Sequence, residues 1–239
     1  MIGCKCSVCK SANPKDKRLR SSVMIEMNRK LFVIDTGPDF RQQMLRENVS
    51  TLTAAVFTHA HKDHIAGLDD IRAFNFIQKK PAEIYASKEV MEALKNEFHY
   101  AFSGIKYPGI PKINLHRIDG ENPFTIEGVT FIPINVLHYN MPVLGFRIGD
   151  FTYITDANKI PDKEKEKIIG SKVFVLNALR RAHHVSHFTF EQAIELMNEL
   201  KPQKGYFTHI SHQLGLHTEV EKELPGFVKL AYDGLKLEM

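Results

Sequence analysis

Short apolar runs recur along the chain, and several end beside a residue that can bind a metal ion. The runs occupy residues 54–57, 129–134, 151–155 and 205–208. Each has the length and apolar character of a buried strand. The metal-capable residues behind them are His59, His138, Asp156 and His209. Because functional side chains are often carried in the turns behind strands, the pattern predicts one site assembled from several strand ends.

The rest of the pattern predicts an α/β protein. Residues 22–27 and 30–34 read as a hairpin around Asn28-Arg29, and residues 83–86 read as a short strand. Helical periodicity covers residues 40–47, 68–78 and 88–100, the last with Ser87 as its cap. Residues 102–111 contain two Pro and two Gly and are predicted to form a loop.

A dense group of metal-binding side chains follows the first run. His59, His61, Asp63 and His64 fall within six residues, and imidazoles with a carboxylate suit zinc, manganese or iron. His59 and His61 alternate, so both can point the same way from an extended segment. Asp63 and His64 lie beyond the turn and can face a second ion. The alternative is a polar turn in solvent, but the spacing favours the start of two adjacent metal sites.

All three cysteines, Cys4, Cys6 and Cys9, lie near the start of the sequence. An odd number within six residues is a poor disulfide framework and fits a thiolate metal site better. Tetrahedral zinc needs a fourth ligand, and His212, three residues beyond His209, is the candidate. The alternative is a set of free surface thiols with a solvated His212.

Length, composition and charge limit the number of domains and the kinds of partner. The chain of 239 residues with 43% hydrophobic content fits one domain, predicted over residues 1–239. No apolar run approaches the roughly 20 residues needed to span a bilayer, and no secretory signal precedes the cysteines, so a cytoplasmic protein without a membrane partner is expected. The net charge of +4 is compatible with an anionic substrate but too weak to indicate nucleic acid. A homodimer is compatible with the sequence.

The motif and its downstream residues resemble the metallo-β-lactamase superfamily. The resemblance implies a four-layer αββα sandwich, with two sheets and helices on both outer faces, around a centre of two divalent ions. One ion would be held by His59, His61 and His138. The other would be held by Asp63, His64 and His209, with Asp156 bridging the two and Asp63 also acting in catalysis. Zinc and manganese are the expected catalytic metals.

The N-terminal cysteines, together with His209-x-x-His212, are similar to the PhnP-type branch of phosphodiesterases, which is related to the tRNA 3′-processing nucleases. This resemblance implies a structural zinc ion on Cys4, Cys6, Cys9 and His212. It also implies a small cyclic phosphodiester as substrate. Family members usually begin with a short strand before the cysteines. Either that strand is absent or the natural chain begins earlier.

A further histidine resembles the branch's residue at the entry to a late helix. His187 precedes Phe188-Thr189-Phe190 and would contact phosphoryl oxygens or protonate the leaving oxygen. A packing role is the alternative. His183 and His184 read as surface residues. Arg180 and Arg181 read as solvated, with a distal phosphate as their other possible partner.

The leading hypothesis is a metal-dependent phosphodiesterase that cleaves small cyclic phosphate esters with a hydroxide activated by two metal ions. The alternative is a nuclease of the tRNA 3′-endonuclease type. That function needs a basic surface and a substrate-binding arm, and the stretch from His138 to Asp156 offers little room for an arm. An inactive binding module and a redox di-iron protein fit the ligand set less well. Asp35, in the turn before the first helix, either orients the metal loop or is a simple turn residue.

Overall fold

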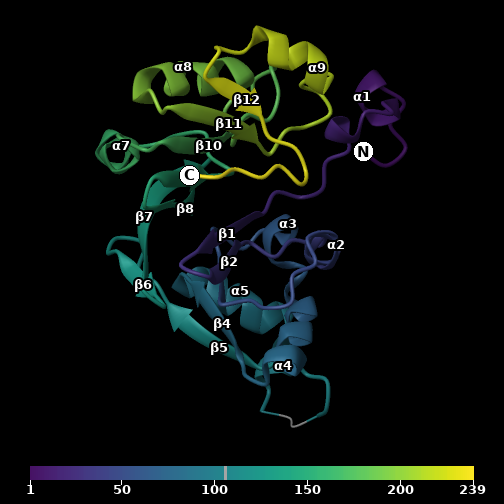
Figure 1. Cartoon of the computed structure of the whole chain (residues 1–239), viewed down its shortest axis with the longest axis vertical. Helices are drawn as coiled ribbons and strands as arrows, with labels where there is room; N and C mark the ends of the chain where they lie inside the picture. Colours follow the sequence, from purple (N-terminus) through teal and green to yellow (C-terminus); the bar gives the residue numbers. More distant parts are fainter. Residues whose placement is uncertain (105–106) are drawn as a thin grey trace. The chain divides into compact units, whose positions relative to one another are not determined.

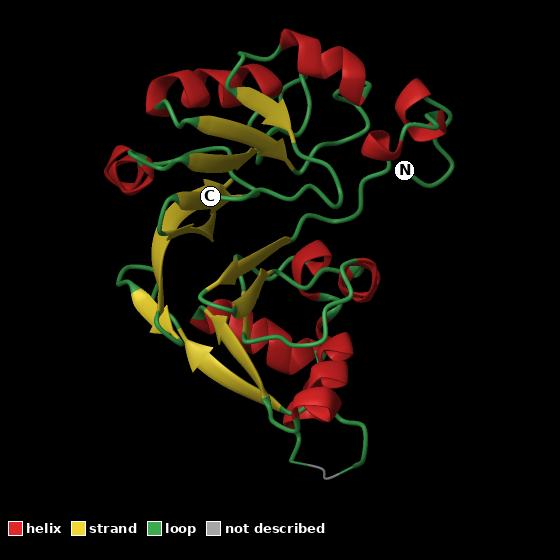
Figure 2. Cartoon of the chain, in the orientation of Figure 1, coloured by secondary structure: helices red, strands yellow, loops and turns green. Residues whose placement is uncertain are grey.

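The computed structural model describes residues 1–104 and 107–239, which form two compact units (Figure 1). The first unit is Arg20–Thr130, and the second combines Met1–Leu19 with Phe131–Met239. Each unit is built around a β-sheet covered by helices (Figure 2). The single domain predicted over residues 1–239 stays a prediction.

The first unit contains a five-stranded sheet in the order β1-β2-β3-β4-β5. Its strands are β1 (Val23–Met27), β2 (Lys30–Ile34), β3 (Ala54–Val56), β4 (Ala82–Ala86) and β5 (Ile113–Arg117). Its helices are α2 (Phe40–Arg46), α3 (Lys62–Ile65), the 3₁₀ turn η2 (Leu68–Ile71), α4 (Arg72–Gln78), α5 (Lys88–Glu97) and α6 (His99–Phe102). Strands β2 to β5 are parallel, and only β1 runs antiparallel to its neighbour.

Local sequence explains the start of this sheet. The hairpin between β1 and β2 turns at Asn28 and Arg29, whose φ angles of 54° and 61° are those of a two-residue hairpin turn. On the next two strands, Ala55 and Ile84 are fully buried. They share a core with residues of the helices that cover one face of the sheet. Burial of this face fixes the register of the strands.

Two predicted helices are divided. The helix expected over residues 68–78 begins as η2 and continues as α4. The helix expected over residues 88–100 ends at Glu97, because Phe98 has left the helical region (φ −110°, ψ 40°), and α6 follows. Within the loop predicted over residues 102–111, Ile105 and Lys106 lie outside the described residues.

The second unit carries most of the other sheet, whose order is β12-β11-β10-β9-β8-β7-β6. The strands are β6 (Phe124–Ile126), β7 (Val129–His138), β8 (Met141–Ile148), β9 (Phe151–Ile154), β10 (Val173–Asn177), β11 (Lys204–Thr208) and β12 (Val228–Leu230). The helices are α1 (Ser7–Lys10), η1 (Pro14–Asp16), α7 (Asp162–Ile168), α8 (Phe190–Leu200), α9 (His217–Val220) and η3 (Glu221–Glu223). Strands β9 to β12 are parallel, so their carboxyl ends lie at one edge.

Helix α8 begins at a capping box. The Thr189 side chain accepts the backbone N–H of Gln192, and the Gln192 side chain accepts the backbone N–H of Thr189. Its buried side chains Phe190, Ala193 and Met197 pack with the parallel strands in one core. The start of α8, just behind His187, is thereby fixed. Among the described residues, no helix combines the length and apolar character needed to cross a membrane.

Candidate metal centre

The first unit brings the side chains of the histidine-rich motif together behind β3. The ring centroids of His59 and His61 are 4.7 Å apart, and those of His59 and His64 are 4.2 Å apart. Asp63 Oδ2 lies 3.6 Å from His64 Nε2. His59 and His64 are buried, whereas His61 is exposed. The turn predicted from the sequence therefore clusters its metal-capable groups.

The Asp35 carboxylate contacts Thr58 and His64 and so orients the loop that carries the histidine-rich motif. Its Oδ1 accepts the Thr58 backbone N–H, and its Oδ2 accepts the Thr58 hydroxyl, both at 2.8 Å. The same Oδ2 lies 2.7 Å from His64 Nδ1. Thr58 Oγ1 lies 2.9 Å from His59 Nδ1. Because Nδ1 is engaged in both rings, Nε2 is the nitrogen through which each would bind an ion. Of the two roles considered for Asp35, its contacts favour orientation of the metal loop.

Two glycines let the Asp35 turn approach the motif. A Cβ atom on Gly37 would lie 2.2 Å from the backbone oxygen of Asp63, and one on Gly67 would lie 2.1 Å from the backbone oxygen of Gly37. Thr36 N–H donates to His64 O, and Gly67 N–H donates to Thr36 O, each at 2.8 Å. A side chain at Gly37 would therefore displace the backbone of Asp63, and one at Gly67 would displace the backbone of Gly37.

Gly37→Ala is therefore expected to destabilise the protein by about 1–3 kcal/mol, the range for overpacking a tight site. It should also weaken metal binding, because Asp63 must move. Thermal melting and titration of metal-free protein with manganese measure the two effects. Gly226→Ala is the matched control, since a Cβ there meets nothing within 4 Å. If the two variants had the same Tm and the same affinity for manganese, this account of the loop would be contradicted.

The second unit gathers another ligand group at the carboxyl ends of its strands. His138 ends β7, Asp156 follows β9, and His209 follows β11. His209 Nε2 lies 3.2 Å from Asp156 Oδ1. Asp156 and His209 both adopt left-handed φ angles, 53° and 51°. Such angles are uncommon for residues other than glycine. The chain thus turns sharply at each strand end and presents the side chain at the sheet edge.

Neighbouring groups orient these ligands. His138 Nδ1 lies 2.8 Å from the Ser186 carbonyl oxygen, which accepts its proton and leaves Nε2 to face an ion. Thr155 Oγ1 donates to Asp156 Oδ2 at 2.6 Å. The Asn177 side chain accepts the Ala157 N–H and donates to the Ala157 carbonyl, which braces the turn after Asp156. The buried carboxylate and imidazoles have the chemistry of a zinc or manganese site.

His187 lies inside this group. Its ring centroid is 4.5 Å from that of His138 and 4.9 Å from that of His209, and its Nδ1 is 3.8 Å from Asp156 Oδ1. The potential ligand atoms of His138, Asp156 and His187 all lie within 4.8 Å of one another. Burial, reinforced by His209, lowers the pKa of His187 to about 3. The ring is therefore neutral near pH 7, which favours hydrogen-bond donation to an oxygen over proton release from an imidazolium.

His184 also belongs beside this group, although the sequence pattern predicts a surface residue. Its side chain is half-buried, and its ring lies 4.9 Å from that of His187. His183 is exposed, as expected. The only local signal for His184 is its spacing of three residues from His187.

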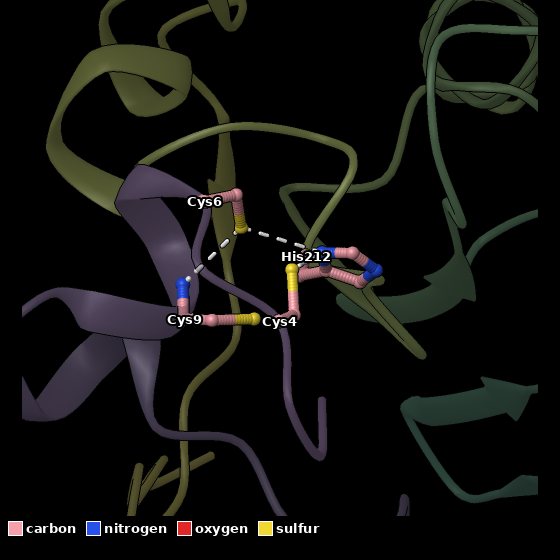
Figure 3. A group of neighbouring side chains, drawn as sticks. All are labelled: Cys4, Cys6, Cys9 and His212. Atoms are coloured by element: carbon pink, nitrogen blue, oxygen red, sulfur yellow. Dashed lines mark hydrogen bonds between the residues drawn. The ribbon is translucent and has the colours of Figure 1, made fainter.

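The cysteines and His212 form a third group, also within the second unit (Figure 3). His212 Nδ1 lies 3.6 Å from Cys4 Sγ and 3.4 Å from Cys6 Sγ. A tetrahedral zinc ion with bonds of about 2.3 Å to sulfur and about 2.0–2.1 Å to nitrogen places two such ligands about 3.6 Å apart. The Cys9 backbone N–H, followed by His212, lowers the pKa of Cys6 to about 6. The group therefore fits zinc in both spacing and donor type.

The structure thus gathers the predicted ligands into three groups. His59, His61, Asp63 and His64 lie in the first unit. His138, Asp156 and His209, with His187, lie in the second unit, as do Cys4, Cys6, Cys9 and His212. Their distribution over individual ions stays a prediction.

Comparison with known proteins decides the family. A model of the beta-lactamase superfamily domain matches residues 30–210. The chain belongs to the beta-lactamase superfamily. The predicted metallo-β-lactamase fold, mixed α/β with two sheets, is confirmed.

Within the superfamily, the chain belongs to the PhnP family. A solved structure of a new diphosphatase from that family is 40% identical, with a TM-score of 0.93, and the match covers 100% of this chain and 91% of that one. The chain therefore belongs to a family of hydrolases, within a superfamily whose members use divalent metal ions.

Two curated relatives are longer than this chain. An octanoyltransferase of Porphyromonas gingivalis is 35% identical over 98% of the chain, and the match covers 48% of that protein. A ribonuclease Z of Methanococcus maripaludis is 25% identical over 82% of the chain, and the match covers 62% of that protein. The chain thus spans about half to three fifths of the length of these relatives.

Proposed function

We propose that this hydrolase cleaves small phosphodiesters, such as cyclic phosphate esters, with the help of two divalent ions. The observation that carries the proposal is the full-length likeness to a PhnP-family diphosphatase at 40% identity. The predicted ligand set is also intact in this chain. The proposal requires the ligands of both units to act on one substrate, as the resemblance implies.

The residues proposed to hold the catalytic ions are His59, His61, Asp63, His64, His138, Asp156 and His209. When bound, two such ions activate a water molecule and neutralise charge on the phosphoryl oxygens. A third ion, zinc, is proposed for Cys4, Cys6, Cys9 and His212, where it would support the fold.

Other residues orient the ligand side chains or donate hydrogen bonds to the substrate. Asp35 and the Ser186 carbonyl hold the rings of His64 and His138 in fixed orientations. His187 is neutral and buried beside Asp156, so we propose that it donates an N–H to a phosphoryl oxygen or to the leaving oxygen. Such a contact, stronger in the transition state than in the ground state, raises kcat.

Processing of RNA ends is the second candidate, favoured by the ribonuclease Z relative. The stretch between His138 and Asp156 argues against it. Strands β8 and β9 occupy that stretch with short turns on either side, so no inserted arm lies there. A small substrate needs no such arm.

A substrate panel tests the proposal. Metal-free protein is loaded with manganese or with zinc, and offered nucleoside 2′,3′-cyclic phosphates, a ribose cyclic phosphate, bis(p-nitrophenyl) phosphate, nucleoside diphosphates and a precursor tRNA. We expect turnover of the small diesters, with a kcat/KM well above that for tRNA, and loss of turnover on chelation. Efficient trimming of the tRNA with the small esters untouched would move the protein to the nuclease function.

A further inference from the structure

Two segments that are far apart in the sequence meet at a buried polar cluster in the second unit. One segment follows the three cysteines and contains η1, and the other contains α9 (Figure 1). The cluster consists of Asp16, Arg18 and His217, and we call it the Arg18 cluster. Asp16 lies seven residues beyond Cys9, and His217 lies five residues beyond His212. The Arg18 cluster therefore joins the two pieces of chain that carry the proposed zinc ligands.

Hydrogen bonds fix the backbone of both segments at this cluster. Asp16 Oδ1 accepts the backbone N–H of His217 at 2.8 Å, and Asp16 Oδ2 accepts the Ser11 hydroxyl at 2.6 Å. The backbone N–H of Leu19 donates to Asp233 Oδ2 at 2.8 Å. The Asp16 side chain is only 2% exposed. Because a buried carboxylate that loses a hydrogen-bond partner is costly, the bond from His217 to Asp16 opposes separation of the two segments.

The Arg18 side chain adds a buried positive charge. Its Nη2 donates to His217 Nδ1 at 3.1 Å, and its Nη1 lies 4.0 Å from Asp16 Oδ1. Burial lowers the pKa of Arg18, and the charges of Asp16 and Asp233 oppose this effect. A guanidinium stays charged in proteins. Separation of the segments would therefore leave a buried cation without one of its partners, which is strongly unfavourable.

His217 must be neutral to complete the cluster. Arginine only donates hydrogen bonds, so His217 Nδ1 accepts from Arg18. The ring proton then lies on Nε2, which is 3.4 Å from Glu221 Oε2. The ring is fully buried. Burial lowers the pKa of His217 against the raising effect of Glu221, and the charge of Arg18 lowers it further. The ring is therefore neutral near pH 7 and can accept the guanidinium N–H.

Short-range hydrogen bonds stiffen the connections between the cluster and the proposed zinc ligands. On the cysteine side, the Asn13 backbone N–H donates to Ser11 Oγ at 3.1 Å. On the histidine side, the Leu214 backbone N–H donates to the Ser211 carbonyl oxygen at 3.1 Å. Because neither connection is a slack loop, a displacement at the Arg18 cluster moves the metal-binding side chains as well.

We propose that the Arg18 cluster positions the proposed zinc ligands, holding the cysteine segment beside His212 and so slowing the release of the ion. This inference rests on the zinc site proposed above. A tetrahedral ion with ligands on two segments leaves only when those ligands move apart, and the cluster opposes that movement. Ligands that are already held together also lose less conformational entropy when the ion binds.

Zinc release tests this role apart from hydrolysis. Protein that keeps only its thiolate-bound zinc after mild chelation is mixed with the dye pyridylazoresorcinol near neutral pH, and transfer of zinc to the dye is followed. Arg18→Ala and His217→Ala should each release zinc at least about tenfold faster than the unmodified protein, the factor for loss of a charge-assisted hydrogen bond.

Two substitutions of His217 separate a specific contact from simple packing. His217→Gln offers a neutral amide oxygen to Arg18 and should restore slow release of zinc. His217→Lys places a second cation beside Arg18 and should not. If the alanine variant of Arg18 folds poorly, Arg18→Lys provides the second test. It keeps the charge but lacks the guanidinium fork, so it should release zinc at a rate between those of the unmodified protein and His217→Ala.

Glu164→Ala is the matched control for a general loss of stability. Glu164 is as buried as the cluster, and its carboxylate accepts the Asn135 backbone N–H and the Lys167 ammonium group, both at 2.8 Å. These partners lie on β7 and α7 of the same unit. The control should lower Tm as the cluster variants do but leave the rate of zinc release unchanged. Release in the cluster variants no faster than in the control would overturn the proposal.

Hydrogen exchange separates this proposal from that of the zinc site. In the protein as purified, the backbone amides of residues 10–19 and 213–221 should exchange about tenfold faster in Arg18→Ala than in the unmodified protein. If the purified protein holds no thiolate-bound zinc, the proposed zinc site fails. Faster exchange in both segments would then still establish that the Arg18 cluster holds them together, and unchanged exchange would overturn the cluster as well.

Discussion

Replacing His209 with alanine is expected to abolish hydrolysis with little loss of stability, whereas replacing His212 should chiefly lower stability. The two side chains lie three residues apart but face different groups. His209 Nε2 is 3.2 Å from Asp156, and His212 Nδ1 is 3.4 Å from Cys6 Sγ. Zinc bound by thiolates contributes folding free energy. A loss of about 3 kcal/mol would lower the Tm of a chain this long by about 6–12 °C.

Activity assays and melting curves on the two variants separate these roles, with His183→Ala as the control because that side chain is exposed. Zinc analysis should show that His209→Ala keeps the thiolate-bound ion after mild chelation, since thiolates favour the softer metal. The division of roles is wrong if both variants lose activity and stability alike.

The second large effect is expected at His187. His187→Ala should reduce kcat by about 10²–10³-fold, the range for loss of one preorganised hydrogen-bond donor to the transition state. KM should change less. The ring is neutral, because burial lowers its pKa to about 3. A neutral donor can be replaced in part by another neutral donor, so His187→Gln should recover about tenfold in kcat over the alanine variant.

Steady-state kinetics from pH 6 to 9 check this assignment. The acid limb of the profile should be the same for the unmodified protein and His187→Gln, because His187 does not titrate in that range. A kcat of His187→Ala within a fewfold of the unmodified protein would leave the ring with a packing role only.

The clustering of the candidate ligand side chains could be predicted from the sequence because its signals are local. His59, His61 and His64 lie in one short motif, and His138, Asp156 and His209 each follow an apolar run. Strand ends of one sheet edge lie together, so the strand pattern alone is enough to group residues that are distant along the chain. The cysteines required only the chemistry of tetrahedral zinc to indicate a distant histidine.

Apart from those of Asp35, the supporting contacts could not be predicted, because they join groups that are far apart in the sequence. The Ser186 carbonyl that orients His138 lies 48 residues away and carries no side-chain signal. The position of His184 depends on the backbone hydrogen bonds between Leu179 and Phe188 and between Phe190 and Arg180, which close the loop between β10 and α8. His217 stands in no recognisable sequence pattern, yet it is fully buried. Its backbone N–H donates to Asp16 Oδ1, and its ring contacts Arg18. Such pairings follow from the packing of segments far apart in the chain.

The distance along the chain between Cys4 and His212 bears on how the protein is made. These two residues, proposed ligands of the zinc ion, are separated by 208 residues. At a synthesis rate of about 5–20 residues per second, His212 leaves the ribosome roughly 10–40 s after the cysteines. Throughout that interval three neighbouring thiols lack their fourth partner and are open to oxidation. Completion of the proposed zinc site would therefore be a late event in biosynthesis, and we expect the yield of native protein to depend on reducing conditions while the chain emerges.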